Sequence, residues 1–202
     1  MDPTCRKQVP MNTPIILASN SPRRRDLLRQ VGVVFTSDAA DVDERVLPGE
    51  KPDIYAVRVA LDKARVVSAR TAAGIVVAAD TVVVLDDVIL GKPVDDRDAE
   101  RMLAKLSGKM HRVITGLAVL DTGTGKTRTE SADTRVWFRT LTQDQIVSYV
   151  STGESLDKAG AYGIQGKGSL LVDRIEGCYF NVVGLPLLLL DRMLADFGIK
   201  LL

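Results

Sequence analysis

The run of consecutive apolar residues Ile75–Ala79 constrains the fold of this chain more than any other feature. A strand with one exposed face would alternate apolar and polar side chains, whereas an uninterrupted apolar run indicates a strand covered on both faces. Segments with apolar residues at helical spacing lie before and after it, at residues 53–70 and 96–106. The run therefore predicts a central strand of an α/β sheet that has helices on its faces.

Apolar periodicity and turn residues predict the other elements. A proline directly after Ser21 indicates a helix start, because proline fits the first helical position after a capping residue. The strand at 75–79 is expected to end at Asp80. Helices are expected at residues 21–30, 53–70, 96–106, 142–150 and 185–197, and further strands at 15–18, 33–36, 82–85, 88–90, 113–120 and 134–138. This order predicts a mixed β-sheet flanked by helices in one domain, residues 14–202, after a flexible N-terminal tail at 1–13.

The composition argues against several classes of function. The chain has 27 Lys and Arg against 26 Asp and Glu, and a net charge of +1 indicates no broad basic surface for nucleic acid. The longest apolar run, near residues 182–190, is much shorter than a membrane span and contains Gly184 and Pro186. Two distant cysteines and one histidine indicate neither a disulfide framework nor a zinc site. We expect a cytoplasmic protein without a membrane or nucleic-acid partner.

The segment from Ser19 to Arg25 is typical of an anion-binding site. Helix N-termini bind anions because their backbone N–H groups are free and carry partial positive charge. Arg23, Arg24 and Arg25 fall in the first helical turn, where positive charges oppose the helix dipole unless an anion is bound. Arginine also forms paired hydrogen bonds with phosphate. A solvated basic turn remains an equally good alternative for these residues taken alone.

Two acidic segments carry candidate catalytic or metal-binding carboxylates. Asp80 follows the buried strand, where α/β proteins place catalytic groups and where partial burial can raise the pKa toward that of a general base. Glu44 lies in an acidic loop, and carboxylates bind Mg²⁺ together with substrate phosphates. A turn-capping aspartate and a solvated loop remain open as structural alternatives.

Two further segments contain glycines beside polar residues. Lys92 lies between Gly91 and Pro93, in a turn where it could contact a phosphate or face solvent. The dense glycines of residues 157–166 indicate a backbone that comes close to another group. Within this segment Gln165 carries both a donor and an acceptor, which suits the edge of a nucleobase as well as an ordinary loop.

In their order and spacing, these segments resemble the Maf family from residue 15 nearly to the C-terminus. The matching segments are Ser19–Arg24, Val42–Glu44, Leu61–Ala64, Ala79–Thr81, Gly91–Pro93, Val113–Gly116, Asp157–Gly166 and Gly177–Pro186. The resemblance implies an elongated α/β fold of two lobes with a cleft, similar to inosine-triphosphate pyrophosphatases. It also implies a metal-dependent enzyme that cleaves a nucleoside triphosphate between its α- and β-phosphates, and it leaves a homodimer open.

The resemblance also implies roles for individual residues. Asp80 matches the catalytic base, and the phosphate-binding positions are Ser19, Arg23, Arg24, Lys63 and Lys92. Glu44, with Asp80 contributing, is expected to bind a divalent cation, either Mg²⁺ or Mn²⁺. Arg23, Thr81 and Gln165 resemble the branch that acts on dTTP and UTP, whereas the branch that acts on 7-methyl-GTP has tryptophan, glutamine and glutamate there.

Two other functions remain open at this point. The Maf family is also called the septum-formation inhibitor family, a name that refers to arrest of cell division. The chain could therefore act mainly by binding a protein partner. It could also hydrolyse unusual purine triphosphates such as inosine triphosphate. The first alternative predicts that an Asp80→Asn variant keeps its function in cells, whereas an enzyme would lose it. A panel of substrates would separate the second.

Overall fold

The computed structural model describes residues 13–202, so the expected tail at 1–13 lies outside the described part except for its last residue. Its centre is a seven-stranded mixed sheet in the order β2-β1-β3-β5-β6-β7, with β4 paired to β3. The strands are β1 (Ile15–Leu17), β2 (Phe35–Ser37), β3 (Ile75–Leu85), β4 (Val88–Leu90), β5 (Met110–Asp121), β6 (Thr127–Phe138) and β7 (Val172–Glu176). The helices are α1 (Pro22–Gln30), α2 (Pro52–Ser68), α3 (Asp96–Leu106), α4 (Gln143–Val150), α5 (Tyr179–Val183) and α6 (Leu187–Ala195), with the 3-10 helices η1 (Ala159–Ala161) and η2 (Gly166–Leu171).

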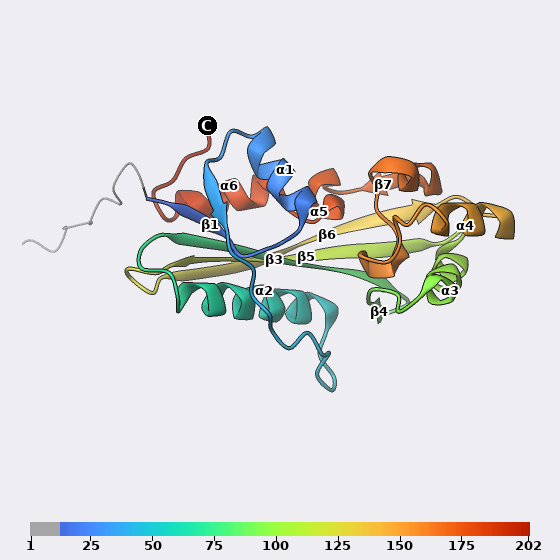
Figure 1. The fold of residues 1–202 in the computed structure, drawn as a ribbon, viewed down its shortest axis with the longest axis horizontal. Coiled ribbons are helices and arrows are strands. Elements are labelled where there is room, and N and C mark those ends of the chain that lie inside the picture. The colour runs from blue at the N-terminus through green and yellow to red at the C-terminus, as the bar shows by residue number, and fades with distance from the viewer. Residues whose placement is uncertain (1–12) are drawn as a thin grey trace, which may run out of the picture.

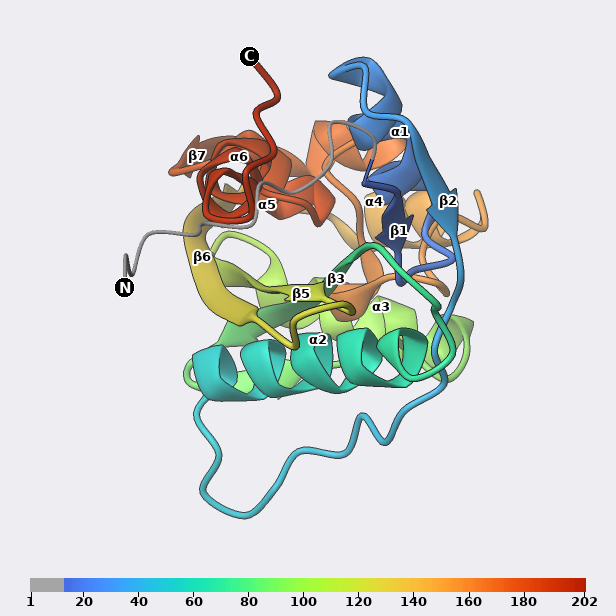
Figure 2. The same cartoon turned by 90° about the vertical axis from the view of Figure 1, so that its left-hand side faces the viewer.

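Helices cover both faces of this sheet, which confirms the predicted fold class. Helix α2 lies along one face of β3 and β5, and α1, α5 and α6 lie on the opposite face (Figures 1 and 2). Val76 and Ala78 pack in the cluster on the α2 side, while Val77 and Ala79 pack in the cluster that includes α6. Alternate residues of β3 thus meet different helices, which is why the run is apolar throughout. The long strands continue to α3 and α4, so the molecule is elongated (Figure 1).

The central strand does not end at Asp80, so that prediction was wrong. β3 continues to Leu85. Asp80 and Thr81 stay in the sheet because β5 pairs with them in unbroken register, Asp80 opposite Gly116 and Thr81 opposite Thr115. A polar pair within an apolar segment is a weak signal for a strand end when the neighbouring strand continues to hydrogen-bond the backbone.

The other edge of β3 is paired in two separate pieces. The pairing of β3 with β1 ends at Val77, and its pairing with β4 begins at Val83. Asp80 and Thr81 lie between these two pieces, and their side chains point to opposite faces because they are adjacent in a strand. This opening between β1 and β4 allows one ligand to reach residues from both faces of the sheet.

Helical spacing predicts that α2 buries the face formed by Ile54, Val57, Leu61, Ala64 and Val67, and the structure buries this face only in part. Ala64 and Val67 are buried as predicted, but Ile54 is 56% exposed. The buried residues of the helix are Tyr55, Ala56, Val59, Ala60, Ala64 and Val67. The alanines among them allow a close approach to the sheet, where a Cβ added at Gly116 would lie 2.3 Å from the carbonyl carbon of Ala56. This contact with β5 determines which face of α2 is buried. It cannot be predicted from the spacing of apolar residues within the helix.

The C-terminal part differs from its prediction in two respects. Strand β7, which pairs with β6, was not predicted. The helix expected at 185–197 is preceded by the short helix α5, and it begins later, at Leu187. Gly184 ends α5 with a φ of 113°, a backbone conformation that favours glycine. Within residues 13–202, no helix has the length and apolar character needed to cross a membrane.

Candidate active site

A cleft of about 430 Å³ opens at the gap between β1 and β4. Every predicted site residue except Ser19 lines it, namely Arg23, Arg24, Glu44, Lys63, Asp80, Thr81, Lys92 and Gln165. These residues come from α1, the loop before α2, α2 itself, β3, the segment after β4 and the loop at 157–166. The tertiary structure therefore brings together residues that are separated by up to 142 positions in the chain.

Lys63 joins the two predicted carboxylates. Its Nζ lies 2.7 Å from Asp80 Oδ1 and 2.7 Å from Glu44 Oε1. The side chains of Lys63 and Asp80 are only 12% and 11% exposed, whereas that of Glu44 is 47% exposed. A carboxylate removed from water needs a partner of this kind, because desolvation disfavours its charged form. Lys63 is thus the counterion of Asp80 in addition to its predicted role at phosphate.

The two carboxyl groups have opposite pKa shifts. Burial raises the pKa of Asp80, and the charge of Lys63 opposes that rise. Burial also acts to raise the pKa of Glu44, but the hydrogen bond and charge of Lys63 outweigh it, and this pKa lies below its ordinary value. Glu44 is therefore suited to remain ionised, whereas Asp80 is suited to accept a proton.

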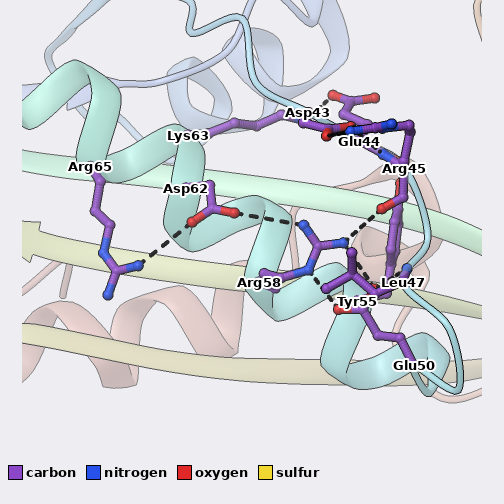
Figure 3. Close-up of polar contacts among 10 residues, drawn as sticks. All are labelled: Asp43, Glu44, Arg45, Leu47, Glu50, Tyr55, Arg58, Asp62, Lys63 and Arg65. Atoms are coloured by element: carbon purple, nitrogen blue, oxygen red, sulfur yellow. Dashed lines mark hydrogen bonds and ion pairs between the residues drawn. The ribbon is translucent and has the colours of Figure 1, made fainter.

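Side chains of α2 hold the loop that carries Glu44 (Figure 3). Tyr55 Oη donates a hydrogen bond to the backbone carbonyl of Glu44 at 2.7 Å. Burial and the nearby carboxylates raise the pKa of Tyr55 to about 12, so its hydroxyl keeps the proton that it donates. Arg58 donates to both carboxylate oxygens of Glu50, at 2.6 and 2.9 Å, and to the carbonyl of Arg45 at 3.0 Å. The loop is therefore held at Glu44 itself and at two residues that follow it.

Arg24 enters the cleft from the first turn of α1 and is held by three hydrogen bonds. It donates from Nε to the carbonyl of Gly184 at 2.8 Å, from Nη1 to Ser19 Oγ at 3.2 Å and from Nη2 to Thr81 Oγ1 at 3.1 Å. Burial lowers the pKa of Arg24, and the charge of Asp80 opposes this. Ser19 lies behind Arg24 rather than in the lining, so in this structure its hydroxyl orients the guanidinium.

Arg23 lies at the mouth of the cleft beside the loop at 157–166. Its Nη1 is 3.1 Å from Asp157 Oδ2, and Lys158 Nζ is 2.6 Å from the other oxygen of the same carboxylate. Burial acts to raise the pKa of Asp157, but its hydrogen bonds with Lys158 and Arg23 lower it. Asp157 therefore stays ionised and fixes Arg23 relative to the loop that contains Gln165.

The same loop is attached to the segment that carries Lys92. The backbone N–H of Gly160 donates to the carbonyl of Gly91 at 2.9 Å. Gly160 has a φ of +66°, and a Cβ at this position would lie 2.9 Å from the side chain of Val83. Only glycine meets both requirements without strain, which explains part of the glycine density noted in the sequence.

Four residues of this site were not assigned from the sequence. Asp157 is the first residue of the glycine-rich segment 157–166, but it was assigned no role of its own from the sequence. Tyr55 has the pattern of an ordinary amphipathic helix residue, and its contact with the preceding loop is tertiary. Thr115 and Asn181 are polar yet fully buried. A threonine within the apolar strand predicted at 113–120 was the available signal, because buried polar groups need hydrogen-bond partners.

The residues of the cleft fit a divalent cation when phosphate is bound with it. No group of three Asp, Glu, His or Cys side chains arranged for a metal occurs within residues 13–202. The carboxylates of Glu44 and Asp80 do converge on one point, which the positively charged ammonium group of Lys63 occupies in this structure. Mg²⁺ is often bound by one or two protein carboxylates and completes its coordination with substrate phosphates and water. Mn²⁺ accepts the same oxygen ligands.

Known proteins are similar to this chain over nearly all of its described residues. The family model described as "Maf-like protein" matches residues 14–197. A protein of Syntrophomonas wolfei named dTTP/UTP pyrophosphatase is 50% identical over 186 residues, which are 92% of this chain and 98% of that protein. A protein of the same name from Moorella thermoacetica is 51% identical over 185 residues, covering 92% and 95%. Among solved structures, a nucleoside-triphosphatase, dITP/XTP pyrophosphatase, from Mycobacterium abscessus matches with a TM-score of 0.42 and 19% identity, over 62% of this chain and 74% of that one.

Proposed function

The chain belongs to the Maf-like protein family, and on this premise we propose that it is a nucleoside triphosphate pyrophosphatase. Its substrates are dTTP and UTP, and its products are the monophosphate and pyrophosphate. The relatives from Syntrophomonas and Moorella, which carry this activity in their names, support the substrates. The observation that carries the proposal is the convergence of Asp80, Lys63 and Glu44 with arginines in one cleft.

In the proposed reaction, Asp80 takes a proton from the water that attacks the α-phosphorus. Its raised pKa supports this role, because a general base works best when its pKa lies near the operating pH, where it is ionised and still has affinity for a proton. Arg24, Lys63 and Lys92 neutralise the triphosphate, so that a nucleophile activated by a carboxylate can approach it. Lys63 contacts both carboxylates in this structure, so it is placed to exchange one of these contacts for a phosphate oxygen.

A divalent cation, Mg²⁺ or Mn²⁺, belongs to the same proposal. Glu44 and Asp80 would hold it together with the substrate phosphates, and when bound it would neutralise charge on the leaving pyrophosphate. The lowered pKa of Glu44 supports its part, because a metal ligand of this type must be ionised.

Three other residues of the cleft are proposed to select the nucleobase. Arg23, Thr81 and Gln165 line the same cleft as the carboxylates, which supports a role for them in contacting the nucleoside. Arg23 is positioned by Asp157, and Thr81 is positioned by Arg24 and Thr115.

The test is a substrate panel of dTTP, UTP, CTP, 7-methyl-GTP and ITP, with Mg²⁺ and then with Mn²⁺. Pyrophosphate and orthophosphate are assayed separately, and Asp80→Asn is run beside the wild type. We expect pyrophosphate from dTTP and UTP and none from the variant. Orthophosphate would indicate cleavage between the β- and γ-phosphates and refute the mechanism. Preference for ITP would favour the purine alternative, and no turnover of any nucleotide would favour a partner-binding protein.

The proposal extends to location and assembly. A cytoplasmic location is proposed from the sequence, because two cysteines far apart in the chain do not indicate a disulfide framework. A homodimer is the proposed assembly on the basis of the family alone. Sedimentation velocity of the purified protein would test it, and a single monomer boundary at micromolar concentration would contradict it.

A further inference from the structure

We propose that Thr115 is a positioning residue that determines base specificity, because it orients the hydroxyl of Thr81 as a hydrogen-bond acceptor for the N3–H group of thymine or uracil. The inference rests on the proposed function. Thr115 lies opposite Thr81 in the pairing of β3 with β5 and is fully buried. It is not among the residues that line the cleft, so it acts on a bound base through Thr81.

The direction of the hydrogen bonds follows from counting hydrogens. Thr115 Oγ1 lies 3.1 Å from the backbone carbonyl oxygen of Asn181 and 2.9 Å from Thr81 Oγ1. A carbonyl oxygen only accepts, so Thr115 donates its single hydroxyl hydrogen to Asn181. Thr115 then has no hydrogen left for Thr81. The contact between the two hydroxyls is a hydrogen bond only if Thr81 is the donor.

This assignment leaves Thr81 without a hydrogen for a ligand. Its hydroxyl hydrogen points to Thr115, and one of its lone pairs accepts the hydrogen bond from Arg24 Nη2 at 3.1 Å. A hydroxyl has two acceptor lone pairs, so one remains. Because Thr81 lines the cleft, this remaining lone pair makes it an acceptor toward a bound base.

The far end of the chain of hydrogen bonds is fixed. Asn181 Nδ2 donates to the carbonyl of Val113 at 2.8 Å and to Thr134 Oγ1 at 2.9 Å. Thr134 also accepts from the backbone N–H of Cys178 at 3.0 Å and donates to the carbonyl of Cys178 at 3.2 Å. These bonds attach α5 to β5 and β6. They therefore fix the position of the Asn181 carbonyl, which accepts the hydrogen of Thr115. Buried networks in which each hydroxyl hydrogen has one acceptor specify a single orientation.

An acceptor at Thr81 distinguishes pyrimidines by the group at N3. Thymine and uracil carry an N3–H donor between their two carbonyls, whereas cytosine presents an unprotonated N3 that only accepts. Cytosine would therefore place a lone pair against the lone pair of Thr81. Sites built for one hydrogen-bonding group reject the analogue that lacks it, because the buried polar groups are left unpaired.

The test compares the wild type with Thr115→Val and Thr115→Ser. Valine keeps the branched shape but removes the acceptor, so the Thr81 hydroxyl becomes free to donate to cytosine N3. The carbonyl of Asn181 keeps its hydrogen bond from the N–H of Gly184 at 2.9 Å, so no buried acceptor is orphaned. Serine keeps the hydroxyl. A Thr129→Val substitution on β6, at a partly exposed position whose partner in β5 is Ala118, serves as the control for exchanging threonine for valine in this sheet.

The measurement is kcat and KM for UTP and CTP, with binding of UMP and CMP by calorimetry as a readout independent of turnover. We expect the preference for UTP over CTP to fall roughly fivefold or more in Thr115→Val, mainly through KM, and to be retained in Thr115→Ser and Thr129→Val. An equal loss for both nucleotides, or a wild type that does not discriminate them, would overturn the inference and leave the proposed function intact. A folded wild type that hydrolyses neither dTTP nor UTP would instead refute the proposed function and the inference with it.

Discussion

Replacing Lys63 by methionine removes the cation that Asp80 and Glu44 share, and the structure predicts a large loss of stability. Methionine fills a similar volume but leaves two carboxylates that both contacted one ammonium at 2.7 Å. Because Asp80 and Lys63 are about nine-tenths buried, solvent cannot replace the lost partner. Breaking a buried ion pair in this way costs about 3 kcal/mol. The free energy of unfolding of Lys63→Met at pH 7 should fall by that amount.

The reverse substitution should be much milder. Asp80→Asn leaves Lys63 paired with Glu44, and it removes a carboxylate whose ionisation burial already disfavours. We expect this variant to lose less than about 1 kcal/mol. The double variant Lys63→Met with Asp80→Asn should regain about 1 to 2 kcal/mol of the stability that Lys63→Met loses, which corresponds to a coupling of about 2 kcal/mol. The raised pKa of Asp80 fixes the sign of the pH effect. A carboxyl with a raised folded-state pKa destabilises the fold above that pKa, so the penalty in Lys63→Met should shrink as the pH is lowered from 7.

Urea unfolding followed by the fluorescence of Trp137, the only tryptophan in the chain, measures these free energies. The control is the same cycle on the exposed pair of Asp26 and Arg29, whose side chains are 69% and 65% exposed and should show no measurable coupling. If Asp80→Asn destabilised the protein as much as Lys63→Met, Lys63 would not be the compensating charge of a buried carboxylate.

Three further results are expected. Gly116→Ala should lower the free energy of unfolding by about 2 kcal/mol or more, because its Cβ would lie 2.3 Å from the α2 backbone; an unchanged melting temperature would contradict the close packing. Asp157→Asn should raise KM for dTTP by roughly twofold to fivefold without changing kcat, because it releases the partly exposed Arg23; steady-state kinetics with an unaltered KM would exclude the pairing as a determinant of binding. Tyr55→Phe should cost about 1 kcal/mol in urea unfolding and lower kcat, because the loop of Glu44 loses the bond at 2.7 Å; unchanged turnover would show that this loop is held by its other contacts.

Part of this protein could be predicted from local sequence. The apolar run Ile75–Ala79 predicted a strand covered on both faces, and the proline after Ser21 predicted the start of α1, because burial and helix capping depend on neighbouring residues. The ordered motifs predicted the family and eight of the residues that line the cleft. Such motifs are short runs of particular residue types, so they can be recognised without knowing which residues contact one another in the fold.

The remaining features depend on pairings between distant segments. β3 continues through Asp80 because β5 hydrogen-bonds it, and α2 buries its small residues because Gly116 of β5 lets it approach. The residues that orient the site, Thr115 and Asn181 among them, belong to segments that are 34 or more positions from Thr81 and contact it or one another only after folding. Residue types therefore determined which chemistry this chain carries. The tertiary structure decided which protons and charges face each other, because hydrogen-bond direction and burial depend on partners that local sequence does not specify.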